Sequence, residues 1–179
     1  MALLPIRTFP DPVLRERAVE VETITDTHRR LAGDMIETMR DAPGVGLAAP
    51  QVGVLERIFV WEVEERSGVV VNPRILLRSD EVIKEEEGCL SLPGLAYEVV
   101  RNAHIAVEGL DLQGNEIVLE GDDLLARVFQ HEIDHLDGVL FIDRLDPAQK
   151  REALGRLREW ALGLPSHSSG AATPPEEAL

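Results

Sequence analysis

Apolar residues recur every three or four positions in three segments of the chain, and each segment is predicted to be a helix. The first covers residues 25–42 and stops before Pro43. The second begins near Asp122 and stops at Gly138, and the third covers 147–162. The apolar positions that carry the first and third patterns are Leu31, Met35, Met39, Leu154, Leu157 and Ala161.

Runs rich in β-branched and aromatic residues predict strands between the first two helices. They cover residues 57–63, 69–72, 104–110 and 116–120, and the second is expected to end at Pro73. Gln113, Gly114 and Asn115 suit the turn of a hairpin between the last two strands. Strands followed by helices, without regular alternation, favour an α+β fold over an α/β fold.

The chain has 179 residues, which is the usual size of one domain, and no internal repeat. We expect residues 1–163 to form that domain. Residues 164–179 are rich in Ser, Pro, Ala and Gly and are predicted to be a disordered tail. One cysteine excludes an internal disulfide, and neither a signal peptide nor an apolar run of membrane-spanning length is found. These features predict a cytoplasmic protein.

Acidic residues dominate the charge, and the formal net charge is -15. This balance argues against nucleic acid as the main partner, because phosphate binding needs clustered Lys and Arg. The acids gather at Glu62 to Glu65, at Asp80 to Glu87 and at Glu116 to Asp123, and we interpret these runs as solvated faces.

The second predicted helix contains His131-Glu132-Ile133-Asp134-His135, an H-E-x-x-H pattern. His131 and His135 lie on one helical face, where two imidazoles can share a divalent metal. Glu132 lies beside them, where a carboxylate can take a proton from metal-bound water. The alternative to a metal site is a purely structural role, with two histidines in the core and a Glu paired with an Arg. The far side of this helix carries Arg127, Gln130, Asp134 and Asp137.

A catalytic metal site of this kind needs a third protein ligand and an open position. The longer zincin pattern fails, because Phe141 stands where its third histidine would be. Glu152 and Glu159 are weak candidates. Cys89 is the better one, although a lone cysteine is also compatible with a small buried hydrophobe.

The segment Gly44–Gly53 is rich in small residues but lacks the spacing of a phosphate-binding loop. Small residues allow another backbone to come close, as when a peptide adds to a sheet edge. Gln51 offers an amide N–H that can donate to an oxyanion. A tight turn followed by a packed strand is the alternative.

Three motifs now stand in order along the chain, GVGLAAPQ at 44–51, EGCLS at 87–91 and HEIDH at 131–135. In this combination the sequence resembles the peptide deformylase family over about residues 5–160. The resemblance implies antiparallel or mixed sheets packed around a central buried metal-binding helix, with a C-terminal helix. It implies removal of the formyl group from the N-terminal formyl-methionine of new polypeptides, with release of formate.

The resemblance also assigns roles to residues. Cys89, His131 and His135 would be the metal ligands, with water as the fourth, and Glu132 the general base and then acid. Gln51 and the backbone N–H of Leu90 would stabilise the oxyanion. The peptide backbone would bind at Val45, Gly46 and Gly88. Helix geometry adds Leu124 and Val128, with Val45, as candidates for the methionine pocket, and core packing is an equal alternative for Leu124.

Family members use one divalent metal, natively Fe²⁺ in many cases, which Zn, Ni or Co can replace. The expected partners are formylmethionyl nascent peptides, with no membrane and no direct nucleic-acid binding. Some members dock on the ribosome through a basic C-terminal helix, and residues 147–162 carry four basic against two acidic residues. An endopeptidase, an inactive peptide-binding relative and a deformylase of altered specificity are the rival hypotheses.

Overall fold

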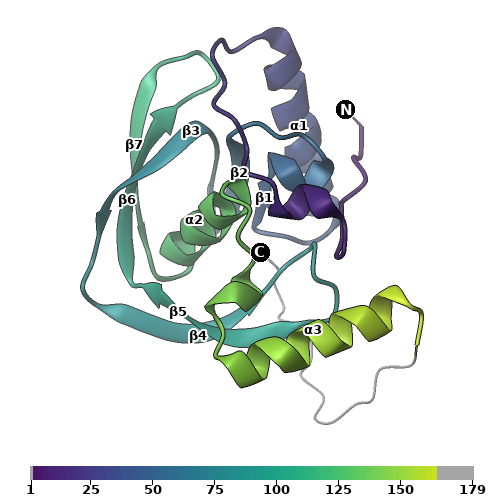
Figure 1. Cartoon of the computed structure of the whole chain (residues 1–179). Coiled ribbons are helices and arrows are strands. Elements are labelled where there is room, and N and C mark those ends of the chain that lie inside the picture. Colours follow the sequence, from purple (N-terminus) through teal and green to yellow (C-terminus); the bar gives the residue numbers. More distant parts are fainter. Residues whose placement is uncertain (1, 165–179) are drawn as a thin grey trace.

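The computed structural model describes residues 2–164. Helix α2 (Asp123–Leu136) lies between a five-stranded antiparallel sheet and a two-stranded antiparallel ribbon (Figure 1). The strands of the sheet are, in order, β1 (Gly46–Ala48), β2 (Ile58–Val63), β3 (Arg66–Arg78), β6 (His104–Leu110) and β7 (Glu116–Asp122). The ribbon consists of β4 (Val82–Gly88) and β5 (Ala96–Asn102). The predicted α+β class with antiparallel sheets is therefore confirmed.

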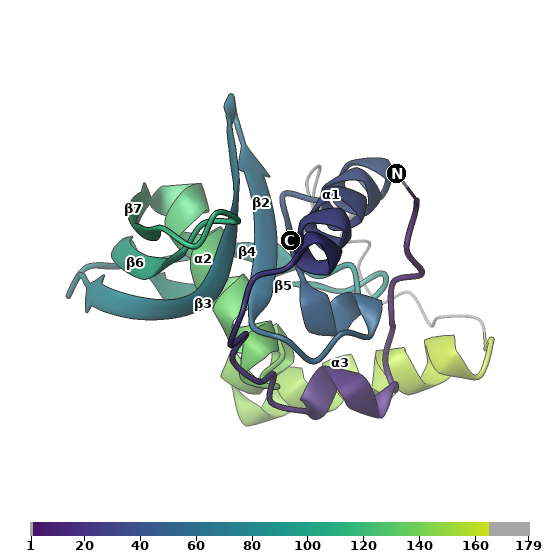
Figure 2. The same ribbon diagram turned by 90° about the horizontal axis from the view of Figure 1, so that it is seen from above.

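Helix α1 (Asp26–Asp41) covers the opposite face of the sheet from α2 (Figure 2). Strand β2 packs against both helices, because successive side chains on a strand point to opposite faces of the sheet. Ile58 and Val60 pack in the cluster that contains Met35 and Met39 of α1. Phe59 and Trp61 pack in the cluster that contains Phe129 of α2, and both contact the ring of Phe129. The prediction of a helix over 25–42 is confirmed to within one residue at each end.

The predicted hairpin is also confirmed, with β6 and β7 paired from Leu110–Glu116 to His104–Asp122. Its turn is closed by Asp111, whose Oδ1 accepts hydrogen bonds from the backbone N–H groups of Gln113 and Asn115. A side chain that bonds the backbone two residues on is a common device of turns.

Strand β3 does not end at Pro73, so that prediction is wrong. The strand runs through Pro73 to Arg78, with a register shift between Val71 and Arg74. Asn72 takes a positive φ at this bulge, and its side chain bonds the N–H and C=O of Val21. Proline is tolerated at a bulge because the residue there makes no ladder hydrogen bond.

The last described part of the chain packs against the ribbon through the short helix η3 (Phe141–Arg144) and helix α3 (Pro147–Ala161). Asp146 caps α3, as its Oδ1 accepts from two backbone N–H groups. Ala153 and Leu157 are the buried residues of α3, whereas Ala161, predicted to share that face, is exposed. The predicted tail, apart from Leu164, lies outside the described residues. None of the helices within 2–164 is long and apolar enough to cross a membrane.

The N-terminal segment crosses the molecule and ties three distant segments together. The backbone N–H of Arg7 donates to Gln51 O at 2.7 Å, and that of Phe9 donates to Ser91 O at 2.9 Å. Further along, after helix η1 (Pro12–Arg15), Ala18 N–H donates to Leu136 O at the end of α2. Gln51 itself lies in the short helix η2 (Ala49–Val52).

Candidate metal centre

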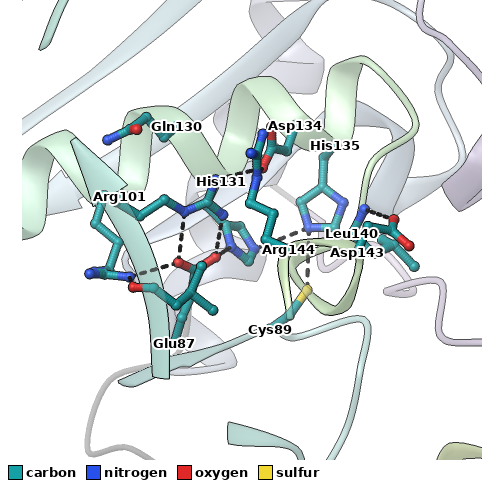
Figure 3. A network of polar contacts seen from close by, with 12 residues as sticks. Glu87, Cys89, Arg101, Gln130, His131, Asp134, His135, Leu140, Asp143 and Arg144 are labelled. Atoms are coloured by element: carbon teal, nitrogen blue, oxygen red, sulfur yellow. Dashed lines mark hydrogen bonds and ion pairs between the residues drawn. The ribbon is translucent and has the colours of Figure 1, made fainter. Parts of the chain in front are cut away.

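Three potential metal ligands meet where the end of β4 faces α2. His131 and His135 project from successive turns of α2, and Cys89 follows the last residue of β4. All three are buried, and one ligand atom from each lies within 4.8 Å of the others. Figure 3 shows the Cys89 sulfur below the ring of His135. Helix α2 is buried from Leu125 to Leu136, so the site lies inside the protein.

The donor atoms have the spacing of ligands around one ion. Cys89 Sγ lies 3.2 Å from His135 Nε2, which lies 3.2 Å from His131 Nε2. Metal–sulfur and metal–nitrogen bond lengths of roughly 2.3 and 2.0–2.1 Å put tetrahedral ligands roughly 3.3–3.6 Å apart. Burial raises the pKa of the Cys89 thiol, as do the nearby charges of Glu132 and Glu87. A bound cation reverses this effect, because a coordinated thiol is deprotonated. The residues therefore fit a divalent metal.

Glu87 orients the first histidine. Its Oε1 lies 2.6 Å from His131 Nδ1, which leaves Nε2 to face the other two donors. Burial raises the pKa of Glu87, but hydrogen bonds and charges from His131 and Arg101 outweigh this and hold it well below its usual range. Glu87 is 1% exposed, so the interpretation of the Asp80–Glu87 run as a solvated face is wrong at its last residue. Glu87 is buried because it pairs with cations that are distant in the sequence.

Those cations belong to an ion network on the ribbon side of α2 that is buried except for Arg144 (Figure 3). Arg101 of β5 bonds Glu87 through Nε and Nη2 and Asp134 through Nη1. Asp134 also accepts two hydrogen bonds from Arg144 of η3. Arg127 of α2 donates to Glu87 Oε2 at 2.9 Å. The polar side of the helix is thus buried as well, apart from Asp137.

Glu132 is fully buried next to the three ligands, and its carboxylate is unusual. Within residues 2–164, neither of its oxygens has a hydrogen-bond partner. Burial raises its pKa well above the usual range, and the negative charges of Glu87 and Asp134 act in the same direction. Its oxygen Oε1 lies against Gly46 of β1, where a Cβ atom would collide with it.

Gln51 is held by both ends of its amide. Its Oε1 accepts from Ala48 N–H at 2.8 Å, so the NH₂ group faces the opposite way. That group donates to Ser91 Oγ at 3.2 Å and lies 3.8 Å from Cys89 Sγ. Leu90 is half-buried and directly follows Cys89 in the chain. The first and second motifs therefore meet at the cysteine.

The predicted substrate-binding residues divide between two places. Val45 and Val128 are buried in the apolar cluster that joins α2 to the sheet, and Leu124 packs against it. Gly46 lies in β1, an edge strand of the sheet, and Gly88 ends β4 beside Cys89. Glu152 is instead an exposed residue of α3 that bonds Tyr97 OH. The ring of Phe141 lies at 27° to that of His131, with 6.4 Å between the ring centroids.

The motifs do not reveal the side chains that surround the ligands. Helical spacing puts Arg127 and Asp134 on the far side of the helix, and no sequence pattern singles out Arg101. Arg127 precedes His131 by one helical turn, and this spacing is the signal that could have drawn attention to it.

Comparison with known proteins places the chain in a family. The family profile described as polypeptide deformylase matches residues 3–151. The chain belongs to the polypeptide deformylase family. A deformylase of Acidothermus cellulolyticus is 54% identical over 163 residues, covering 90% of each chain. The Thermus thermophilus deformylase structure is 48% identical with TM-score 0.84, covering 90% of this chain and 96% of that one. The Legionella pneumophila structure is 41% identical with TM-score 0.85 and the same coverage.

The activity follows from membership of the deformylase family. The enzyme is a metal-dependent hydrolase that removes the formyl group from the N-terminal methionine of nascent peptides. The buried cluster of one cysteine and two histidines could hold the metal ion that this chemistry requires.

Proposed function

We propose that Cys89, His131 and His135 hold the one divalent metal of this deformylase. The observation that carries the proposal is the spacing of their three donor atoms, which matches a single coordination sphere. Held there, the metal supplies Lewis-acid chemistry, since it acidifies water and polarises a carbonyl oxygen. A thiolate with two imidazoles suits Fe²⁺ and Zn²⁺, and we propose Fe²⁺ as the native ion, with Zn, Ni or Co able to replace it.

Glu132 moves the protons in this proposal. Its two oxygens, unpaired within residues 2–164, are free to accept a proton from the attacking water. A raised pKa suits a carboxyl that must then give that proton to the leaving amine, because an amine anion leaves poorly.

Gln51 and the backbone N–H of Leu90 are proposed to stabilise the oxyanion that forms on the formyl oxygen. The bond from Ala48 N–H to Gln51 Oε1 supports this role, because it turns the amide donor toward Cys89. A donor that is already oriented costs no reorganisation during the reaction, and one such donor is commonly worth about 10²–10³ in rate.

The substrate backbone is proposed to bind along Val45, Gly46 and Gly88. Strand β1 supports this, because it is an edge strand and its outer hydrogen-bonding groups can pair with an extended peptide. Leu124 and Val128 are proposed to contact the methionine side chain, together with Val45.

The chain is further proposed to act as one catalytic domain over residues 1–163, in the cytoplasm where formylated chains emerge. Docking of α3 on the ribosome is also proposed, and it is supported by Arg151 and Arg158, which are exposed. Of the other two cations in α3, Lys150 bonds Asp143 and Arg156 bonds Gly94 O. Co-sedimentation with ribosomes that survives deletion of 147–179 in a folded protein would exclude this docking.

The test of the site is formate release from formyl-Met-Ala-Ser by protein purified without oxygen and loaded with Fe²⁺. We expect rapid release that a chelator abolishes and added Fe²⁺ restores. Release that persists after the metal has been removed would refute the proposed metal site. The same assay with Zn²⁺, Ni²⁺ and Co²⁺ identifies which ions support activity.

A further inference from the structure

Glu87 is held by more donors than a ligand-orienting carboxylate needs. Its Oε1 pairs with His131 Nδ1 at 2.6 Å and accepts from Arg101 Nη2 at 2.5 Å. Its Oε2 accepts from Arg101 Nε at 3.0 Å and from Arg127 Nη1 at 2.9 Å. All four residues are at most 3% exposed, so water does not compete for these bonds.

The two arginines differ in what else they hold. Arg101 is shared between Glu87 and Asp134. Arg127 has Glu87 as its hydrogen-bonded acidic partner within residues 2–164, and the largely exposed Glu85 lies 3.9 Å from its Nε. Its remaining bonds go to backbone carbonyls of the ribbon, including Val99 O at 3.1 Å. Arg127 therefore fixes the position of Glu87 relative to both α2 and β5.

That position matters because of the geometry at His131. A carboxylate at Nδ1 selects the tautomer with its proton there, so the lone pair of Nε2 faces the other donors. Arg127 lies one turn before His131 on the same helix. Its hydrogen bond therefore ties the Glu87 carboxylate to the helix that carries the histidine.

We propose that Arg127 is a positioning residue for the metal centre. It holds the Glu87 carboxylate in the orientation that keeps the proton on His131 Nδ1 and directs His131 Nε2 toward Cys89 and His135. The inference rests on the ligand set proposed above. A purely structural Arg127 would neutralise a buried charge, and its loss would lower stability without changing the affinity of the folded protein for metal.

The test compares Arg127→Met with Arg57→Met in the full chain, using Co²⁺ as the probe. Arg57 is the matched control, because it is also a buried arginine that bonds the same helix, at Leu136 O and Asp137. It does not contact the Glu87 carboxylate. Affinity is measured by competition with a chelator, and the thiolate-to-cobalt absorption band reports the coordination by Cys89.

We expect Arg127→Met to weaken Co²⁺ binding by about 10- to 100-fold, the usual loss when an outer hydrogen-bond partner of a metal site is removed. Arg57→Met should keep the wild-type affinity, even if both variants melt at lower temperature. Wild-type affinity in folded Arg127→Met overturns the inference. If Arg127→Met does not fold, Arg127→Lys replaces it, and a loss of affinity is expected because an ammonium does not reproduce the guanidinium geometry.

A double-mutant cycle with Glu87→Gln separates a direct effect from one that acts through the carboxylate. We expect Arg127→Met to add little to the loss of affinity already caused by Glu87→Gln. If the two fold-losses of Co²⁺ affinity multiply in the double variant, the proposal that Arg127 acts through the Glu87 carboxylate is refuted. Wild-type protein that binds Co²⁺ without a thiolate band would instead refute the ligand set itself, and the inference with it.

Discussion

Gly46→Ala tests how closely the first motif is fitted to Glu132, the carboxylate proposed to move the protons. A Cβ atom on Gly46 would lie 2.8 Å from Glu132 Cδ and 3.1 Å from Glu132 Cγ, and closer still to Oε1. Alanine keeps the backbone N–H and C=O with which β1 is proposed to bind a peptide, so the substitution changes only the space in front of Glu132. The added methyl group must push the carboxylate back, since Gly46 lies in a strand and is buried.

The size of the displacement follows from these contacts. Carbon atoms in contact prefer a separation of about 3.5 Å or more, so Cδ must retreat by about 0.7 Å. A misplacement of about 1 Å in a catalytic group can cost about 10²-fold in rate. We therefore expect Gly46→Ala to lower kcat/KM by about 10- to 100-fold while the protein still binds one metal.

Gly155→Ala is the control for this experiment. Gly155 lies in α3, and a Cβ there meets nothing within 4 Å. It should keep full activity and gain up to about 1 kcal/mol in stability from helix propensity. Formate release and metal content are measured for both variants. Full activity in Gly46→Ala, at wild-type metal content, would refute the reasoning about Glu132.

Four further predictions concern the site and its surroundings. Cys89→Ser should weaken metal binding by more than about 100-fold, beyond the loss expected for an outer partner, and full metal content by elemental analysis would contradict this. Glu132→Gln should keep the metal but lose about 10²–10⁴ in turnover. Because burial raises the Glu132 pKa, metal-free wild-type protein should lose stability as pH rises above about 4.5, and Glu132→Gln should flatten that slope in denaturant titrations. Burial raises the pKa of Asp143, but bonds from Arg15 and Lys150 outweigh it and lower the pKa, so its stabilisation should be present at neutral pH and disappear as pH falls below about 3.8. Asp143→Asn should therefore cost up to about 1 kcal/mol at pH 7 and little at pH 2, and an equal loss at both would count against this assignment.

Local sequence patterns predict the helices and strands whose defining residues are close together in the sequence. The hairpin of β6 and β7 was predicted because its strands and turn are contiguous, and α2 because its caps and motif coincide. The ribbon was missed, because β4 contains three consecutive glutamates and reads as a charged loop. Its burial at Glu87 depends on Arg101 and Arg127, and no local pattern shows that these cations lie beside it.

The candidate ligands were found from motifs, whereas their supports depend on pairing register. The register of β4 and β5 puts Ile83 opposite Arg101 and Glu87 opposite Tyr97, so Arg101 and Glu87 lie on the same face of the ribbon. The expectation that the strand ends at Pro73 is wrong because this proline lies at a bulge, where Asn72 is held by hydrogen bonds to Val21, a residue distant in the sequence.

The crossing of the N-terminal segment has a consequence for how the enzyme acquires its metal. Arg7 and Phe9 bond the backbone at Gln51 and Ser91, and Ala18 bonds the end of the helix that carries the histidines. These contacts have high contact order, so the chain must close its longest loops before the segments around the donors are fixed in place. We therefore expect metal capture to come late in folding, and the bound ion to contribute its binding free energy to the same cooperative transition. Loss of metal and global unfolding should therefore occur together along a denaturant titration.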